Sequence, residues 1–508
     1  MNQEETTLPR TLPPAVGGLN SSVALANMGE TDAVILENFI AFPDRVETRS
    51  GAETHLTALG ATTYGLHAYN GPSGTDKLFA TTSGGVFDAT SAGAAGAAVA
   101  VLTNGLTWSI SIQTGAGSYM MIGNGVDSIR MFDGAAWSTP AAFGGLATAD
   151  CACAEVYKQR IFFGKKSTLS LFYLGVNAIA GAATEYSLGA IFRRGGYIVA
   201  LATWSVDGGS GPDDMLVIAT SSGEIAVFTG SDPSSASTWT LKGVFFIGRP
   251  VGKFHSLYKY GGSVLFLSES GLFPLSAALL TASIDRTTAL SRKIEQLFSD
   301  LAQTYGANDG WQIISLPNVP ILLVNVGGYP GGLQLVMHSV SKAWSTFTGW
   351  VGYSFGRLGT QPYMGRADDV SKVLTGVSDF TANITATSLQ AYNRFGTSSN
   401  KQIKMTRPTY IATGTFQYTL GWDSDFRNQP TSNLISSGAG TASLWGTGVW
   451  GAAFWTSSSL LNRGWRTVPD RPGVYKAFYQ QIVTKAVSVA HESTDLLIAP
   501  MDVFGVNG

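Results

Sequence analysis

Five histidines are the first residues in this sequence whose chemistry could define a site. Metal sites in proteins draw His, Cys, Asp or Glu ligands together at short, regular spacings. No two of these histidines stand at such a spacing. His338 follows an apolar stretch, which favours a hydrogen-bonded core or turn residue over a ligand. The sequence therefore predicts no metal centre at His55, His67, His255, His338 or His491.

Cys151 and Cys153 are the two cysteines of the chain, and both lie in the segment ADCACAEVY. Two cysteines are too few for a disulfide-stapled fold. The segment alternates like a β-strand, so both thiols are expected on one side of it. No histidine or second cysteine pair stands nearby, which disfavours a metal-binding C-x-C site. We predict two small buried thiols.

The acidic segment DGGSGPDD at 207–214 could offer oxygen ligands to calcium. Its candidates, Asp207, Asp213 and Asp214, lack the alternating spacing of known calcium loops, so a solvated turn is favoured. No HExxH, GxSxG, Walker-type or GxGxxG pattern stands between a strand and a helix. We therefore expect no catalytic, cofactor-binding or metal-binding residue and no cofactor.

Glycoside hydrolysis needs two carboxylates placed across the scissile bond. Sialidase-type β-propellers also carry repeated S-x-D-x-G-x-x-W turns, whereas SVDGGSGPD in this chain lacks the closing tryptophan. Isolated carboxylates such as Asp88, Asp133 and Glu269 are expected in turns. The chain is therefore predicted not to be an enzyme. The alternative to this prediction is a β-propeller that binds or cleaves glycans.

Composition narrows the class of protein further. The chain has 508 residues, a net charge of −2, 44% hydrophobic residues and only 13% charged residues. Disordered chains combine low hydrophobicity with high charge, so disorder is excluded. The slightly acidic balance disfavours a protein that binds nucleic acid by neutralising phosphates. So little charge on a large chain favours contacts with other subunits over a solitary polar surface.

The basic residues form no stripe that could follow a phosphate backbone. The densest group is Lys401, Lys404 and Arg407, and on a strand Lys401 and Lys404 would face opposite sides. This argues against tight DNA binding, but it is compatible with a duplex that slides through a channel.

The dominant pattern is a repeated hairpin, in which an apolar strand, a small polar turn and a second strand follow one another. Such hairpins begin 41 to 57 residues apart. A period of about 40–50 residues with strand hairpins is typical of a β-propeller, while paired β-sandwiches or barrels are the alternative. Trp137, Trp239 and Trp344 close three repeats and are expected to pack between blades. The seven hairpins span 78–90, 119–134, 160–174, 215–230, 264–276, 321–339 and 362–376.

One short helix is predicted inside this all-β pattern. In 288–303, apolar residues recur on one helical face, and Ser291 or Thr288 could cap the N-terminus. Local packing against the ring is favoured over a docking role. The face consists of Leu290, Ile294, Leu297, Phe298 and Leu301.

The domain prediction has three parts. Residues 1–60 lack the hairpin pattern and are interpreted as an N-terminal platform segment, 61–395 as the β-propeller region, and 396–508 as a C-terminal β domain. Within the last part, the Gly- and Trp-rich segment 438–455 is expected to project toward a partner surface, with an internal hairpin as the alternative.

No membrane or export segment is expected. The N-terminus lacks a basic start followed by an apolar core, and the apolar stretch 91–102 is shorter than the ~20 residues that a membrane span needs. The chain is predicted to fold in a cytoplasm, or to leave it by a route other than Sec.

Two segments near the N-terminus carry a family resemblance. LPPAVGGLN at 12–20 precedes DAVILENFIAFPDRVETRSG at 32–51. This order resembles the start of the tail nozzle, or tail hub, proteins of short-tailed bacteriophages. The specific resemblance covers about 40 residues, and the hairpin ring and following helix agree with it in a general way. The matching positions are Gly17, Gly18, Leu19, Asn20, Asp32, Ala33, Asn38, Pro43, Arg49 and Gly51.

The resemblance implies a virion structural protein. Such proteins form a homohexameric ring below the adaptor, with a propeller outside and β extensions around the lumen. They retain packaged double-stranded DNA, release it at infection, and dock fibres or spikes. The implied location is the virion tail, assembled in the bacterial host cytoplasm. A tail-fibre adhesin is disfavoured, because the chain has no long repetitive shaft.

Overall fold

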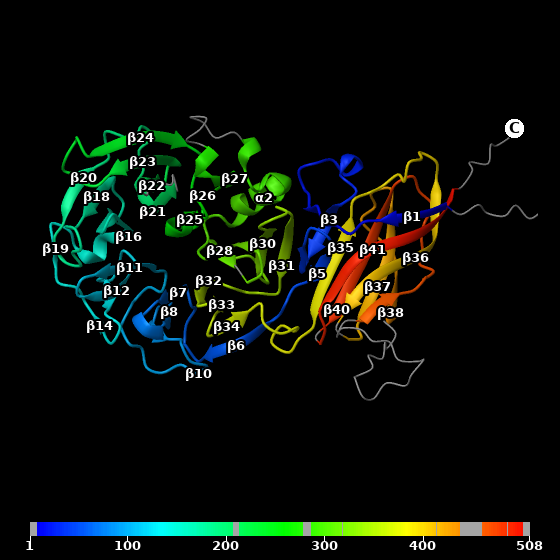
Figure 1. Ribbon diagram of the computed structural model, residues 1–508, viewed down its shortest axis with the longest axis horizontal. Coiled ribbons are helices and arrows are strands. Elements are labelled where there is room, and N and C mark those ends of the chain that lie inside the picture. Colours follow the sequence, from blue (N-terminus) through cyan, green and yellow to red (C-terminus); the bar gives the residue numbers. More distant parts are fainter. Residues whose placement is uncertain are drawn as a thin grey trace, which may run out of the picture.

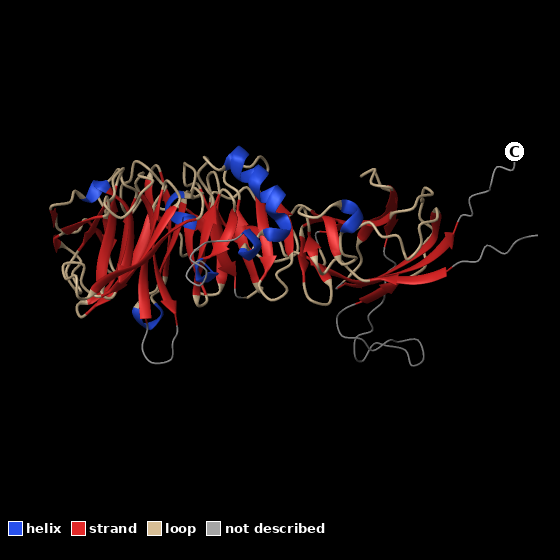
Figure 2. Cartoon of the chain, turned by 90° about the horizontal axis from the view of Figure 1, so that it is seen from above, coloured by secondary structure: helices blue, strands red, loops and turns tan. Residues whose placement is uncertain are grey.

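The computed structural model describes residues 8–206, 213–277, 286–316, 318–412, 414–436, 460–484 and 486–500. It is an all-β protein with two units: a closed ring of small sheets, and a β-sandwich at one side of the ring (Figure 1). Viewed from its edge, the molecule is elongated and flat, and the strands of the ring run from one of its faces to the other (Figure 2).

The ring is a β-propeller, and its described residues form seven antiparallel blades. Small twisted sheets suit a ring because packing blade on blade buries both faces of each sheet and leaves only short edges. Blades one to three comprise β7 (Gly65–Tyr69), β8 (Lys77–Thr82) and β9 (Gly85–Asp88); β11 (Trp108–Thr114), β12 (Gly117–Gly123), β13 (Arg130–Phe132) and β14 (Trp137–Ser138); and β16 (Cys151–Tyr157), β17 (Arg160–Lys165), β18 (Ser170–Tyr173) and β20 (Thr184–Ser187). Blades four to six comprise β21 (Ile198–Val206), β22 (Asp213–Thr220), β23 (Glu224–Gly230) and β24 (Trp239–Phe246); β25 (Leu257–Tyr260), β26 (Ser263–Ser268) and β27 (Gly271–Pro274); and β28 (Gln312–Leu316), β29 (Ile321–Asn325), β30 (Leu333–His338) and β31 (Trp344–Thr348).

The seventh blade closes the ring with strands from distant parts of the chain. β32 (Ser354–Leu358), β33 (Gln361–Gly365) and β34 (Val370–Val373) pair in order, and β6 (Ala52–Thr57) adds to β34 in antiparallel register. β10 (Gly93–Ala94) then pairs with β6. An early strand in the last blade ties the two ends of the propeller together, so the ring cannot open without breaking a sheet.

All seven predicted hairpins are confirmed. Each one forms two adjacent strands of a different blade, from β8–β9 to β33–β34. These central strands are almost wholly buried, which explains their visibility in the sequence as short apolar runs between polar turns.

Trp137 and Trp239 pack at blade contacts, as predicted, and the indole of Trp344 donates to the carbonyl of Leu290 in the segment between blades five and six. Trp137 lies 4.9 Å from Phe79 of the first blade, measured between ring centroids. Trp239 stacks on Phe228 of its own blade at 5.2 Å and on Phe162 of the third blade at 6.0 Å. Trp344 is fully buried. Flat aromatic rings therefore fill the wedge between neighbouring sheets.

The predicted helix is present between the fifth and sixth blades. It consists of η5 (Arg286–Thr288), η6 (Arg292–Ile294) and α2 (Glu295–Tyr305), and Ile294, Phe298 and Leu301 are buried as expected. The capping prediction is wrong for Ser291. The Ser291 hydroxyl accepts a hydrogen bond from the Leu272 amide, because it is buried against β27 rather than free to fold back on its helix.

The two cysteines do not face the same side. A β-bulge between Cys151 and Cys153 inserts an extra residue into β16, so Cys151 joins the core between blades two and three and Cys153 that between blades three and four. An extra residue reverses the alternation of a strand, which the sequence pattern could not reveal.

The sandwich is built from both ends of the chain. One layer contains β1 (Leu8–Leu12), β4 (Phe39–Ala41), β5 (Val46–Thr48), β36 (Lys401–Ala412), β39 (Leu460–Arg463) and β41 (Val489–Pro500). The other contains β3 (Asp32–Glu37), β35 (Ile384–Gln390), β37 (Gln417–Ser424), β38 (Thr431–Ser436) and β40 (Lys476–Thr484), with β2 (Gly18–Leu19) beside β3.

These pairings redraw the predicted domain boundaries. The platform segment 1–60 is not a unit of its own in its described part: its strands up to β5 belong to the sandwich, and β6 belongs to the propeller. The second layer also continues into the sixth blade, because β3 pairs with β31. The unit to which a short strand belongs depends on the strands it pairs with. A segment without the repeated hairpin pattern therefore cannot be assigned to the propeller or the sandwich from its sequence.

Candidate functional site

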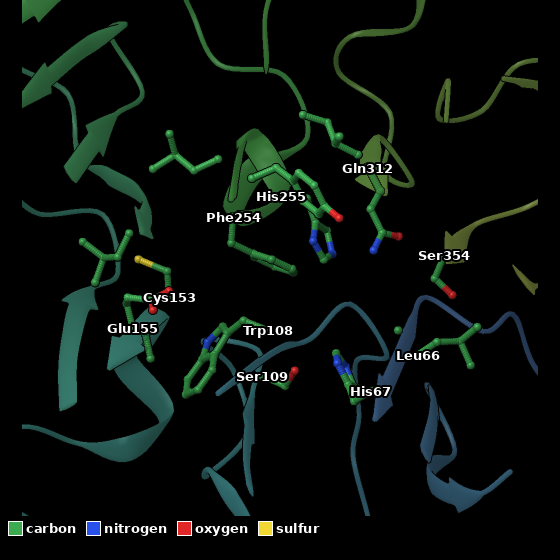
Figure 3. A pocket seen from close by; sticks show the side chains of 16 residues that line it. Leu66, His67, Trp108, Ser109, Cys153, Glu155, Phe254, His255, Gln312 and Ser354 are labelled. Carbon is green, nitrogen blue, oxygen red and sulfur yellow. The ribbon is translucent and has the colours of Figure 1, made fainter. Parts of the chain in front are cut away.

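The centre of the propeller holds a cavity of about 270 Å³, here called the central cavity (Figure 3). The inner strand of every blade contributes to its wall, which is why no single stretch of sequence identifies it. Polar and aromatic side chains dominate the lining. They include His67, Trp108, Ser109, Cys153, Glu155, Phe254, His255, Tyr258, Gln312 and Ser354.

Two histidines point into this cavity from opposite sides (Figure 3). His67 lies on β7, and its Nε2 is 2.7 Å from the hydroxyl oxygen of Thr107. The Thr107 hydroxyl is in turn 2.8 Å from that of Thr81. Burial, together with the nearby His255, lowers the pKa of His67 to about 3. The imidazole is therefore neutral across the physiological range.

His255 sits on η4 (Lys253–Ser256), the short turn that precedes the fifth blade. Burial lowers its pKa to about 4. Its ring packs against Phe254 at a centroid distance of 4.5 Å. Its ring nitrogens make no hydrogen bond to any other residue in the described ranges, so they are free to bind a molecule in the cavity.

The remaining reactive groups of the cavity are held by neighbours. Glu155 accepts hydrogen bonds from Lys259 at 2.8 Å and from Thr203 at 3.2 Å. Burial raises the pKa of Cys153 to about 12 and raises that of Cys151 as well, so both thiols stay protonated. The cavity can thus hold a small polar molecule through neutral hydrogen-bonding groups.

The resemblance residues occupy a different place, the junction between propeller and sandwich. Arg49 is the centre of this junction cluster, with only 1% of its side chain exposed. Its guanidinium donates to both oxygens of Asp379, at 2.9 and 2.6 Å, and to the Asn38 side chain at 2.8 Å. It also lies 4.4 Å from the ring centroid of Trp350, whose indole donates to Asp379.

This cluster joins three segments that are far apart in the sequence. Asn38 links β3 to β4, Trp350 follows the last strand of blade six, and Asp379 lies between blade seven and β35. The Asn38 amide donates to the carbonyl of Thr385, at the start of that sandwich strand. A paired, hydrogen-bonded charge at such a point fixes orientation, because losing one partner leaves the other charge buried.

A second set of resemblance residues anchors the N-terminal segment to the helix. The Asn20 amide donates to Asp32 at 2.8 Å, and Lys293 of η6 donates to the other Asp32 oxygen at 2.8 Å. Lys293 also donates to the carbonyl of Gly17. Gly18 has φ +78°, and a side chain there would overlap the backbone of Trp344. The motif thus specifies a close approach between the N-terminal segment and blade six.

The other predicted positions fall outside any common site. Asp207 and the segment 438–455 lie outside the described residues, so the solvated turn expected at 207–214 and the projecting loop expected at 438–455 stay predictions. Asp214 bonds to the hydroxyl of Ser205. Within the described ranges no group of three or more His, Cys, Asp or Glu residues is placed to hold a metal ion.

The basic group of the C-terminal unit is confirmed not to form a stripe. Lys401 is fully buried and donates to the carbonyls of Thr397 and Val474. Arg407 pairs with Asp495 at 2.7 Å. His338 is buried as the sequence predicts, and His55, His67 and His491 are buried too.

One buried ion pair has no signal in the sequence. Lys476 contacts both oxygens of Asp470, at 2.7 and 2.8 Å, and neither side chain is exposed. Lys476 also donates to the hydroxyl of Ser424. The pair holds the segment before β40 against the sandwich. Its two residues are six apart in the sequence, and only folding buries both of them.

Comparisons with known proteins complete these observations. No protein-family model and no curated protein sequence matches the chain. Among solved structures, the chain is similar to a crystal structure of BBS1N in complex with ARL6DN soaked with mercury, with a TM-score of 0.39 and 12% identity, over 64% of this chain and 98% of that one. The lead-soaked crystal of the same complex gives a TM-score of 0.39 and 12% identity over 66% and 100%. In the described part of the chain no helix is long and apolar enough to cross a membrane.

Proposed function

We propose that this chain is a structural subunit of the tail nozzle ring of a short-tailed bacteriophage. In this role it extends the DNA channel below the adaptor, retains packaged DNA and releases it at infection. The observation that carries the proposal is the placement of the resemblance residues. Asn38 and Arg49 tie a propeller to a β-sandwich, and Gly17, Asn20 and Asp32 anchor the N-terminal segment beside that contact.

A nozzle subunit must hold its lumen-forming part in a fixed position against the pressure of packaged DNA. The junction cluster suits this demand, because Arg49 is buried and donates to Asn38, to Asp379 and to the carbonyl of Thr348, which lie in three different segments. The continuous sheet from blade six through β3 into the sandwich adds backbone hydrogen bonds across the same contact. In the proposal the propeller lies outside and the sandwich faces the lumen.

The state of four basic side chains of the sandwich supports a channel that does not grip DNA, while Arg10 and Arg427 are exposed. Lys401 and Lys476 are buried, and Arg407 and Arg463 both pair with Asp495. Neutralised cations release few counterions from a duplex, so DNA could slide past them. The proposed partners are five further copies in a homohexamer, the adaptor above, and fibres or spikes at the side. The proposed location is the virion tail.

The test is assembly, measured by light scattering on the purified chain alone and after mixing with the adaptor ring. The expected product is a closed ring of about six subunits, because head-to-tail contacts between two different faces close into cyclic assemblies. Arg49→Ala is expected to reduce assembly, whereas the control Arg45→Ala, at an exposed pair near the same segment, is expected to leave it unchanged.

Electron cryo-microscopy of the virion tail supplies the second readout. The chain is expected below the adaptor, around the DNA channel. A chain that stays monomeric with the adaptor present, and is absent from the tail density, would contradict the proposal.

A further inference from the structure

A second pocket lies on one face of the propeller, beside the C-terminal end of α2. Its volume is about 230 Å³, and we call it the rim pocket. It is lined by the loops that lead into blades four, five and six, and it shares His255 with the central cavity. A concave site with convergent polar groups on a rigid ring is a typical ligand site.

The backbone around the rim pocket is fixed, although several of its side chains are exposed. Tyr197 is 46% exposed, yet its backbone amide donates to the Ser221 hydroxyl and its carbonyl accepts from the Ser221 amide. Gly252 has φ +88° and comes so close to Trp311 that a side chain would crowd it. The pocket is therefore preformed, and binding would order few groups.

The charges in the rim pocket favour a ligand with one negative group. Lys253 pairs with Asp309 at 2.6 Å, which leaves these two charges balanced. The Arg249 guanidinium is exposed and forms no ion pair with a described carboxylate, because the neighbouring Glu269 carboxylate faces the backbone amide of Arg249, at 3.5 Å. A planar guanidinium that lacks a partner binds a carboxylate through two parallel hydrogen bonds.

The neutral groups favour hydroxyls and an apolar ring face. Tyr197 offers an aromatic surface at the pocket wall, next to Leu106 and Pro250. The amide of Asn308 and the neutral imidazole of His255 can each donate and accept hydrogen bonds. A single unpaired cation is too little for a nucleotide's phosphates. We propose that the rim pocket binds a saccharide that carries a carboxylate, with the sugar on Tyr197 and the carboxylate on Arg249.

The pocket is built for binding rather than cleavage of that sugar. Hydrolysis uses two carboxylates on either side of the bond. Asp309 is the one carboxylate among the described residues that line the pocket, and Lys253 holds it. The inference does not depend on the nozzle ring, since the pocket lies within one subunit.

The test uses the full chain, with digalacturonic acid as the acidic probe and galactobiose as its neutral counterpart. Ligand-observed saturation-transfer NMR and calorimetry are expected to show binding of digalacturonic acid, and binding of galactobiose at least about tenfold weaker. Tyr197→Ala is expected to weaken both sugars about tenfold or more. Arg249→Gln is expected to remove the preference for the acidic sugar.

Arg427→Gln, at an exposed arginine of the sandwich, is the matched control and should leave binding unchanged. Absence of binding to both sugars, or binding that Tyr197→Ala leaves intact, would overturn the site. Equal binding of the two sugars would overturn the carboxylate assignment. Circular dichroism of each variant checks that the fold is retained, and because Tyr197 and Arg249 are both exposed, their loss should leave folding unaffected.

Discussion

The propeller and the sandwich both have buried apolar cores, but the propeller pairs strands that are close in sequence and the sandwich pairs strands from the two ends of the chain. Each blade is made mainly from one continuous stretch of chain, and most blade contacts have an apolar core of their own, whereas blades five and six share one with the sandwich. The sandwich pairs β1 near the N-terminus with β41 near the C-terminus, and it encloses buried charges and a buried histidine. Local contacts form readily, whereas distant pairings pay a larger loop-closure entropy. The sandwich and its junction are thus expected to be more sensitive to single substitutions.

Arg49→Ala is expected to have the largest effect on stability, because it acts at the junction of propeller and sandwich. It leaves Asp379 without its cation and removes the contact with Trp350, so a loss of about 3–5 kcal/mol in unfolding free energy is expected. Calorimetry should show one transition in the natural protein and two in the variant, as propeller and sandwich uncouple. Arg45→Ala, at a pair whose arginine is 34% exposed, should cost less than about 1 kcal/mol. Equal effects of the two variants would refute the importance of the junction.

Lys476→Met tests the sandwich by itself. The substitution leaves Asp470 buried and unpaired, so we expect a loss of about 3 kcal/mol in denaturant unfolding, confined to probes in the sandwich. The double variant Lys476→Met with Asp470→Leu should recover much of this loss, because it removes both charges. If the double variant is as unstable as the single one, the segment before β40 is not held by charge pairing.

Acid should weaken both units through their buried histidines. Burial lowers the pKa of His491 in the sandwich to about 4 and those of His67 and His255 to about 3 and about 4. The unfolded chain then binds protons below about pH 6.5 while the folded chain does not, so stability is full above that pH and falls toward pH 4. Unfolding free energies from denaturant titrations at pH 7.5 and 4.5 should differ by several kcal/mol, about 2–3 kcal/mol for each of the three histidines. His491→Gln should reduce this difference, and an unchanged difference would exclude its part.

The smallest effect is expected at the outer surface of the propeller. Lys77 and Asp88 form an ion pair at 3.1 Å, and both side chains are 39% exposed. Lys77→Ala should therefore change the unfolding free energy by less than about 0.5 kcal/mol. A thermal melt of this variant sets the scale for the other measurements. A shift as large as that of Arg49→Ala would remove the contrast between surface and junction.

The repeated hairpins, the helix face and the blade tryptophans could be predicted from the sequence alone. These depend on residues close together in the chain, where an alternating or helical apolar pattern acts directly on the backbone. The sequence also indicated the N-terminal motif through residue types such as Asn38 and Arg49, without showing what they contact.

Other features could be seen only in the folded structure. These are the number of blades, the closure of the ring through β6, the division of the N-terminal strands between sandwich and propeller, and the placement of Cys151 and Cys153 on opposite sides of β16. Folding also created the central cavity, the rim pocket and the buried ion pair of Lys476 with Asp470. The ring closure and the shared N-terminal strands depend on pairings between distant parts of the chain, and the placement of the cysteines depends on a single bulge. Lys476 and Asp470 are only six residues apart, but their burial depends on the sandwich around them. Which strands pair depends on the burial achieved by the whole folded chain, so it cannot be predicted from a local sequence pattern.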